Sequence, residues 1–300
     1  MEPHHQSNDL RVITDWLGQR VINDGYYVLS EGNLEVTRAS SVSSEQTNVL
    51  TQPCVCIVSQ GAKLVTAGKG SLQYVENESS MVVYASEIPI RVAINRASEE
   101  HPYFCLMVPL TARRISEVAS RLYPNGIPKA GKESAVYVRE SVPQIVNAIR
   151  RMLQNIDDPK QGDLLIPLAI EEVVVRLLCS DIGPAIAQMG VSDSHTAQIN
   201  QAISWLKKHY TLPMRVEELA RDIGMSVSSF HAHFKAIVGI TPLQFQKTLR
   251  LQAARRLIIS NEMDVSLAAF EVGYASTSQF SREYVREFGI APSRDSSLVP

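Results

Sequence analysis

The chain has 300 residues, of which 45% are hydrophobic and 20% charged, and 29 lysines and arginines against 31 acidic residues give a formal net charge of −2. This length and composition are typical of a globular protein with two domains. No run of 18 apolar residues occurs, and the first ten residues lack the layout of a secretory signal. We therefore expect a soluble, cytoplasmic protein without a membrane partner. Four cysteines are too few for a disulfide scaffold.

The charge is unevenly distributed along the chain. Residues 1–194 carry 17 basic and 22 acidic side chains, whereas residues 195–300 carry 12 basic and 9 acidic ones. An acidic body joined to a mildly basic tail is expected if only the tail binds an anionic partner.

The first elements in chain order are a helix and a set of strands. Leu10, Ile13, Leu17 and Val21 have helical spacing and predict a short amphipathic helix. From about residue 34 to 110, six or more β-rich runs alternate with polar stretches or glycine turns such as Ala67-Gly68-Lys69-Gly70. Such a series predicts an antiparallel barrel or jelly roll. Six of the runs are CVCIVSQ, KLVTAG, SLQYV, MVVYAS, IRVAINRA and YFCLMVPL.

After Thr111 the hydrophobic period becomes helical, over 112–122, 142–155 and 163–179. The last segment is apolar around much of its circumference, so it either packs on both sides or forms a dimer interface. Pro167 within it suits a first helical turn or a kink. The polar stretch SDSHTAQ at 192–198 is a plausible domain boundary, and the chain after it is predicted to be helical.

The tail contains an internal repeat, in which residues 219–242 resemble residues 268–292. Gly224 matches Gly273 at an offset of 49 residues. Four further pairs match at an offset of 50: Phe230/Phe280, Phe234/Tyr284, Gly239/Gly289 and Pro242/Pro292. Two copies indicate a duplicated supersecondary unit.

Each copy has the features of a helix-turn-helix. The first helices are predicted over Val216–Ile223 and Val265–Val272, and each ends at a glycine suited to positive φ. Ser226 and Ser276 are predicted caps, with Gln279 at capping-box spacing from Ser276. The edge opposite the apolar side chains of each second helix is left for a partner. It comprises Ser228, His231, Ala232 and Lys235 in the first copy and Ser278, Ser281, Arg282 and Val285 in the second.

These side chains suit a DNA major groove, because Arg can bond guanine bidentately and hydroxyls can reach bases or phosphates. The alternative is two helical hairpins of a protein-interaction domain, although two spaced copies joined by a defined helix disfavour it. His231 can be a base or phosphate contact or a surface residue without such a role. The joining helix is predicted to start at Thr241-Pro242-Leu243-Gln244 and to run for about 17 residues, roughly 25 Å. That length can hold two recognition helices about one DNA turn apart, so one chain can read two successive major grooves.

Residues 195–292 resemble the DNA-binding domain of the AraC/XylS family of bacterial transcription regulators. The resemblance rests on ELARDIGMSVSSFHAHFK, TPLQFQKTLRLQAARRLI and GYASTSQFSREYVREFGIAP. It implies base-reading roles for Ser228, His231, Ala232, Thr277, Ser278, Ser281 and Arg282. The chain departs from the family at Tyr284, where Phe is frequent, and at Val285, where Lys is frequent. It also has Pro292-Ser293-Arg294-Asp295 where an aromatic-Arg pair commonly follows the final proline.

The front half contains PCVCIVSQGAKLVTAGKGSLQYVENESSMVVYASEIPIRVAI, followed by LLIPLAIEEVVVRLLC and DSHTAQIN. On these segments it is similar to the cupin-like N-terminal domain of an AraC-type subgroup. The resemblance implies an α+β fold in which a cupin-like antiparallel β-barrel with a helical region precedes an all-α domain of two helix-turn-helix units joined by a long helix. The expected domains are a sensor at 1–125, a helical dimerisation region at 126–194 and a DNA-binding domain at 195–300, with helix-turn-helix units at 216–238 and 265–288. It further implies a small-molecule or reactive, aldehyde-like effector, activation of transcription with RNA polymerase as partner, and a homodimer.

Metal and thiol chemistry centres on the barrel region. Its only histidine is His101, so we expect no metal site and no cofactor. Cys54 and Cys56 share one face of a strand. They are either small core residues or, with Cys105, effector-sensing thiols that react with an electrophile, which requires exposure and a lowered pKa.

No Ser-His-Asp order, P-loop or dinucleotide glycine motif occurs, so we expect a protein that is not an enzyme. The alternative function is an enzymatic or ligand-binding barrel whose helical tail makes protein contacts.

Overall fold

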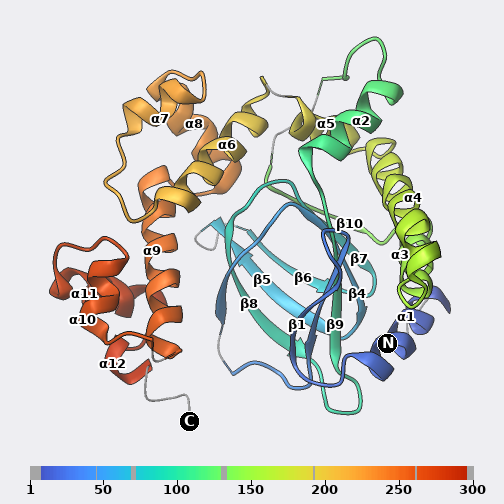
Figure 1. Ribbon diagram of the computed structural model, residues 1–300, viewed down its shortest axis with the longest axis horizontal. Coiled ribbons are helices and arrows are strands. Elements are labelled where there is room, and N and C mark those ends of the chain that lie inside the picture. The colour runs from blue at the N-terminus through green and yellow to red at the C-terminus, as the bar shows by residue number, and fades with distance from the viewer. Residues whose placement is uncertain are drawn as a thin grey trace. The chain divides into compact units, whose positions relative to one another are not determined.

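The computed structural model describes residues 8–44, 46–68, 72–129, 134–191, 193–260 and 262–295 (Figure 1). The chain divides into two compact units, residues 1–197 and 198–300. Residues 1–7, Lys69 and Gly70 of the predicted glycine turn and Ser192 of the predicted boundary lie outside the described residues. Within the described ranges, no helix combines the length and the apolar character that crossing a bilayer requires.

The first unit contains two antiparallel sheets. The larger has the strand order β1-β2-β9-β4-β7-β10 and the smaller the order β3-β8-β5-β6. The larger sheet consists of β1 (Gly25–Ser30), β2 (Leu34–Ala39), β4 (Cys54–Gln60), β7 (Ser80–Tyr84), β9 (Tyr103–Pro109) and β10 (Val136–Glu140). The smaller consists of β3 (Thr47–Leu50), β5 (Ala62–Ala67), β6 (Leu72–Asn77) and β8 (Pro89–Arg96). The predicted α+β class is confirmed, but strand pairing in the described residues gives two separate sheets and not a closed barrel.

The central strands of the six-stranded sheet are buried on both faces. Alternate side chains of each strand point to opposite faces of the sheet. Val55 and Ile57 of β4 belong to a hydrophobic core that the sheet shares with the helices of this unit. Cys54 and Cys56 have the opposite parity on the same strand and therefore lie on the other face. Cys56 and Cys105 of β9 come close to a residue of β6, so this second face points toward the four-stranded sheet.

Helices cover the outer face of the six-stranded sheet, with α1, α3 and α4 running beside it (Figure 1). Leu10, Ile13, Leu17 and Val21 are buried in this layer, which confirms the amphipathic first helix. The helices of the first unit are α1 (Asn8–Arg20), α2 (Ala112–Leu122), α3 (Pro143–Asn155), α4 (Pro159–Leu178), α5 (Gly183–Ala187) and the 3₁₀ turn η2 (Gln188–Gly190).

Two features of this helical layer differ from the sequence expectation. Helix α4 begins at Pro159 after the N-cap Asp158, so Pro167 lies inside the helix and not in its first turn. Strand β10 was not predicted, and it pairs antiparallel with β7 at the edge of the larger sheet. The region 126–194 therefore contributes a strand as well as helices to the first unit.

The second unit is helical, and α9 passes between two helix pairs (Figure 1). Its helices are α6 (His195–His209), α7 (Val216–Asp222), α8 (Val227–Val238), α9 (Pro242–Ile259), α10 (Val265–Glu271), α11 (Thr277–Phe288) and α12 (Pro292–Asp295). The capping box predicted at the start of α9 is present: Thr241 accepts from the backbone N–H of Gln244, whose side chain accepts from the Thr241 N–H. With 18 residues, α9 is about 27 Å long.

Candidate nucleic-acid interface

Helices α7 and α8 form the first helix-turn-helix around two buried phenylalanines. Phe230 and Phe234 pack edge to face, with ring centroids 5.5 Å apart. Gly224 lies in the turn directly after α7 and has a φ of +72°, a backbone conformation that favours glycine. The Ser226 side chain caps α8 by accepting a hydrogen bond from the Ser229 N–H, as predicted.

The opposite face of α8 is exposed. All four predicted contact residues of this helix lie on it: Ser228, His231, Ala232 and Lys235. Because burial of the phenylalanines fixes the rotation of α8, these four side chains point away from the core of the unit.

Helices α10 and α11 repeat the arrangement around Phe280. Gly273 has a φ of +90° in the turn, and Ser276 caps α11 by accepting from the Gln279 N–H. Only this half of the predicted capping box is present, and the Gln279 amide nitrogen donates to Glu283, at 3.3 Å. Gln279 thus connects the first turn of α11 to a buried carboxylate.

The predicted contact residues of α11 differ in exposure. Ser278 and Arg282 are exposed, whereas Thr277 and Ser281 are half-buried. Arg282 forms no ion pair with the residues that the structure describes, which leaves its guanidinium available for a partner. Val285, on the same side of the helix, is 43% exposed.

Two polar side chains of α9 connect the segment before α7 to the turn before α11, and sequence reasoning missed both. The Gln246 amide donates to the carbonyls of Tyr210 (3.1 Å) and Leu212 (2.7 Å). The Arg250 guanidinium donates to the carbonyls of Tyr210 (2.6 Å) and Gly273 (2.9 Å). Partial burial lowers the pKa of Arg250, but a guanidinium remains charged in proteins. Helix α9 therefore fixes the segment before α7, and through Arg250 it also fixes the turn before α11.

Glu283 attaches α11 directly to α9. Its carboxylate accepts from Lys247 Nζ (2.9 Å), from Tyr274 OH (2.9 Å) and from the Gln279 amide. Burial alone would raise the pKa of Glu283, but these three donors outweigh it and lower the pKa. The carboxylate is therefore charged and fully engaged at neutral pH.

The departures from the family pattern at Tyr284 and Asp295 are in contact with each other. The Tyr284 hydroxyl donates to Asp295 at 2.7 Å, and Arg255 Nε donates to the same carboxylate at 2.8 Å. Burial and the neighbouring carboxylate raise the pKa of Tyr284, so its hydroxyl stays a donor at neutral pH. A phenylalanine at position 284 could not make this bond, so the two departures form one polar contact between α11 and α12.

The three candidate sensing thiols lie together inside the first unit. Cys54, Cys56 and Cys105 are buried, and the Sγ atoms of Cys54 and Cys56 are 3.7 Å apart. The hydrogen bond with Cys56, together with burial, raises the pKa of Cys105 well above its usual range. For Cys56 the contact with Cys105 lowers the pKa, but the contact with Cys54 and burial raise it more. Burial and thiol protonation both disfavour direct attack on an electrophile.

A buried ion pair, which sequence reasoning missed, lies against these thiols. Lys63 and Glu76 are direct cross-strand partners in the four-stranded sheet, with Nζ 3.0 Å from Oε2. The Tyr84 hydroxyl donates to Glu76 Oε1 at 2.7 Å. One ligand atom each from Cys56, Glu76 and Cys105 lies within 4.8 Å of the other two. The cluster thus joins side chains from both sheets.

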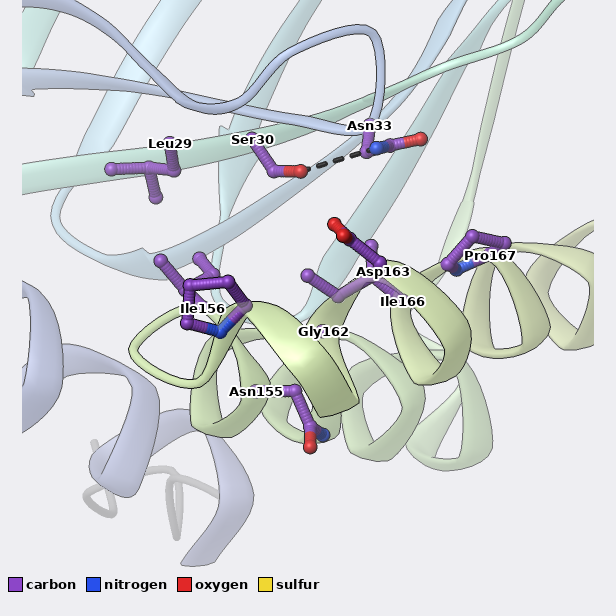
Figure 2. A pocket seen from close by; sticks show the side chains of 10 residues that line it. Leu29, Ser30, Asn33, Asn155, Ile156, Gly162, Asp163, Ile166 and Pro167 are labelled. Atoms are coloured by element: carbon purple, nitrogen blue, oxygen red, sulfur yellow. Dashed lines mark hydrogen bonds between the residues drawn. The ribbon is translucent and has the colours of Figure 1, made fainter.

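A surface pocket of about 220 Å³ opens where the β1–β2 turn approaches the start of α4 (Figure 2). In it, the Asn33 amide donates to the Ser30 hydroxyl at 3.1 Å. Its volume is below the roughly 300–1,000 Å³ of sites for drug-sized ligands. Its lining residues are Leu29, Ser30, Asn33, Asn155, Ile156, Pro159, Gly162, Asp163, Ile166 and Pro167.

The chain is similar in sequence to curated transcription regulators and in fold to a solved structure. Pseudomonas aeruginosa "HTH-type transcriptional regulator ExsA" is 28% identical over 133 residues, which cover 44% of this chain and 47% of that protein. Escherichia fergusonii "HTH-type transcriptional activator RhaS" is 28% identical over 155 residues, 50% of this chain and 55% of that protein. The chain thus spans about half the length of these curated relatives. ToxT from Vibrio cholerae shares the fold, with a TM-score of 0.57 at 13% identity, over 92% of this chain and 99% of that one.

Two family profiles match the chain in succession. The "AraC-type transcriptional regulator N-terminus" matches residues 32–185, just over half of the chain, and a "Helix-turn-helix domain" matches residues 219–296. The second range contains both recognition helices and α9. The chain therefore belongs to the AraC-type transcriptional regulators.

Proposed function

We propose that this regulator binds double-stranded DNA by placing α8 and α11 in two successive major grooves. The observation that carries the proposal is the pair of exposed polar helix faces on two helices that both pack against α9, α8 through Phe234 and Phe245 and α11 through Glu283 and Lys247. An α9 of about 27 Å is of the same order as the roughly 34 Å between successive major grooves. Its side chains contact both recognition helices, since Phe245 packs against Phe234 of α8 and Lys247 pairs with Glu283 of α11. The proposed contacts are Ser228, His231, Ala232, Lys235, Thr277, Ser278, Ser281 and Arg282.

These contacts divide by chemistry. Arg282 can form two hydrogen bonds to guanine and so read a base. Lys235 suits a phosphate as a point charge, and the N-terminal hydroxyls of α11 suit phosphates or base edges. Residues 195–300 carry a net charge of only +3. Specific affinity must therefore come from base contacts or from a second subunit as well as from phosphates.

The N-terminal unit is proposed as a sensor that controls a cytoplasmic, non-catalytic activator. In this division residues 1–125 sense a small-molecule effector, residues 126–194 mediate dimerisation, and residues 195–300 bind DNA and act together with RNA polymerase. The helix-turn-helix match over residues 219–296 supports DNA binding by the last part, and the match of residues 32–185 to a regulator N-terminus supports a separate regulatory part. The words "transcriptional activator" in the name of RhaS support activation. Cys54, Cys56 and Cys105 remain the candidate sensing residues, although their burial favours binding over reaction with an aldehyde.

Helix α4 is the proposed dimer interface, with a second copy of the chain as its partner. The inner face of α4 is buried within the chain. The sequence predicts that α4 packs on both sides or forms a dimer interface, and a single chain covers only one side. Leu164, Leu168 and Val175 form an exposed stripe at i, i+4 and i+11. Glu171 lies within this stripe and is paired with Arg121. An apolar stripe of this kind is self-complementary when two copies are related by a two-fold axis.

Binding of the full chain to its own upstream DNA, measured by gel shift over a salt titration, tests the DNA proposal. We expect affinity to fall steeply with salt, because phosphate contacts release counterions. Arg282→Ala should weaken specific binding by about 1–3 kcal/mol if Arg282 reads a base. Arg113→Ala on α2 removes the same charge from an exposed position of the first unit and should leave binding unchanged.

Other outcomes separate the alternatives. An equal loss for Arg282→Ala on specific and non-specific DNA would make Arg282 a phosphate contact only. The absence of any shift at low salt would overturn the proposal and favour a ligand-binding barrel whose helical tail makes protein contacts.

A further inference from the structure

The interior between the two sheets of the first unit holds polar groups that the proposed DNA-binding function does not use. Glu76 is 1% exposed, and Lys63 is its only cationic partner among the described residues. Burying an ion pair costs several kcal/mol per ion in desolvation, and apolar replacements are often at least as stable. Here the pair lies beside two buried thiols from the opposite sheet.

We propose that Cys56, Glu76 and Cys105 bind a zinc ion that ties the six-stranded sheet to the four-stranded sheet. Two thiolates and one carboxylate are the kinds of ligand that Zn²⁺ accepts, whereas Ca²⁺ and Mg²⁺ require oxygen ligands. The ligands come from β4, β6 and β9, so the ion would connect strands from both sheets. This inference does not depend on DNA binding.

The spacing of the ligand atoms is close to that of a zinc site. Tetrahedral coordination with Zn–S bonds of about 2.3 Å places two sulfurs about 3.8 Å apart. The three ligand atoms lie within 4.8 Å of one another, so the sulfur–sulfur distance needs to contract by at most about 1 Å and each sulfur–oxygen distance by at most about 1.3 Å. Cys54 Sγ is 3.7 Å from Cys56 Sγ, but it is not one of the ligand atoms that all lie within 4.8 Å of one another, so it stays outside the proposed ligand set.

The surrounding charges also fit a divalent cation. With Cys56 and Cys105 as thiolates, the negative charges of these two ligands and Glu76 balance the positive charges of Zn²⁺ and Lys63. Tyr84 donates to the other oxygen of Glu76, and Tyr74 OH lies 2.7 Å from Tyr84 OH. Such outer hydrogen bonds fix the orientation of a ligating carboxylate. The neutral sum lowers the cost of burying the site relative to one with an uncompensated charge.

Metal analysis of the full chain tests the site. Protein expressed in zinc-supplemented medium and purified without chelator should contain about one zinc per chain. The double variant Cys56→Ser/Cys105→Ser and the single variant Glu76→Gln should lose most of it. Cys179→Ser removes the exposed cysteine and should retain it. Circular dichroism and thermal unfolding establish that each variant is folded.

A spectroscopic measurement on the unmodified chain does not depend on the folding of any variant. Protein prepared with Co²⁺ in place of Zn²⁺ should show near-ultraviolet thiolate-to-cobalt absorption and visible bands of tetrahedral cobalt. Zinc-free protein after supplementation, zinc retained by the folded double variant, or cobalt without thiolate absorption would each overturn the proposal. DNA binding can succeed or fail independently of these results.

Discussion

Two equivalent glycines of the repeat lie in very different surroundings. A Cβ on Gly273 would lie 2.1 Å from the carbonyl oxygen of Thr211, whereas a Cβ on Gly224 would meet nothing nearer than Gln198 Nε2 at 3.5 Å. Both residues have positive φ, so both substitutions carry the left-handed backbone cost of about 1–2 kcal/mol. Only Gly273 adds a collision with backbone.

We therefore expect Gly273→Ala to lower the free energy of unfolding by at least about 2 kcal/mol more than Gly224→Ala. Gly273 is also where Arg250 donates, so the collision displaces a support of α11. Urea unfolding of the two variants, followed by helical circular dichroism, measures the difference. Equal losses would mean that the Thr211 segment moves aside at little cost.

The Tyr284–Asp295 contact gives a second prediction for single residues. Hydrogen bonds to a charged group contribute about 1.5–3 kcal/mol, and this one is buried. Tyr284→Phe should destabilise the chain by about this amount, and Asp295→Asn should also destabilise it because Arg255 loses its anionic partner. The double variant should lose less than the sum of the single losses, by about 1 kcal/mol. Additive losses in urea unfolding would show that the hydroxyl and the carboxylate are not coupled.

At the scale of elements, local pattern was sufficient for the helices of the second unit and insufficient for the sheets. Apolar spacing, glycines and caps specified both helix-turn-helix units, since all of these signals are close in sequence. Strand β10 follows a gap of more than 50 residues after its partner β7, and its five residues carry no strong alternation. The division into two sheets depends on such distant pairings, which a single sequence does not encode locally.

The polar contacts inside the first unit could likewise be predicted only where the residues are close in sequence. The thiols at 54 and 56 were predicted to share a face because a strand has a period of two, and they do. Glu76 was missed because its relation to Cys56 and Cys105 arises only when the sheets face each other. The expectation that the barrel region has no metal site rested on its single histidine, and the group of Cys56, Glu76 and Cys105 contains none. The charged side chains of Lys63 and Glu76 within β-rich runs were the available signal.

The exposed face of α11 offers a prediction at this scale. Val285 is 43% exposed and stands where the family frequently has lysine. Val285→Lys should strengthen binding to any DNA sequence and steepen the slope of log affinity against log salt by about 0.9, the effect of one added phosphate contact. Fluorescence anisotropy at several salt concentrations measures the slope. An unchanged slope would place position 285 away from the phosphates.

At the scale of the whole molecule, the net charge of −2 conceals the mildly basic charge of the proposed DNA-binding unit. A monomer with a net charge of +3 over residues 195–300 has few cations to neutralise phosphates. A dimer would double both the phosphate contacts and the number of recognition helices per complex. The proposed self-association through α4 would therefore raise the affinity of the protein for DNA.

Substitution of the α4 stripe tests this association in the intact chain. We expect the unmodified protein to have about twice the 33.2 kDa chain mass by light scattering after size exclusion. Leu164→Glu and Leu168→Glu should give monomers, because each places a carboxylate in the apolar interface. Ile22→Glu is the control, since Ile22 is 72% exposed and Leu164 71%, and it should leave the dimer intact. An α4 interface would be contradicted if the unmodified protein is a monomer at tens of micromolar, or if the control variant dissociates as much as the α4 variants. If only the α4 variants dissociate and also bind the operator more weakly, the affinity for DNA depends on the dimer.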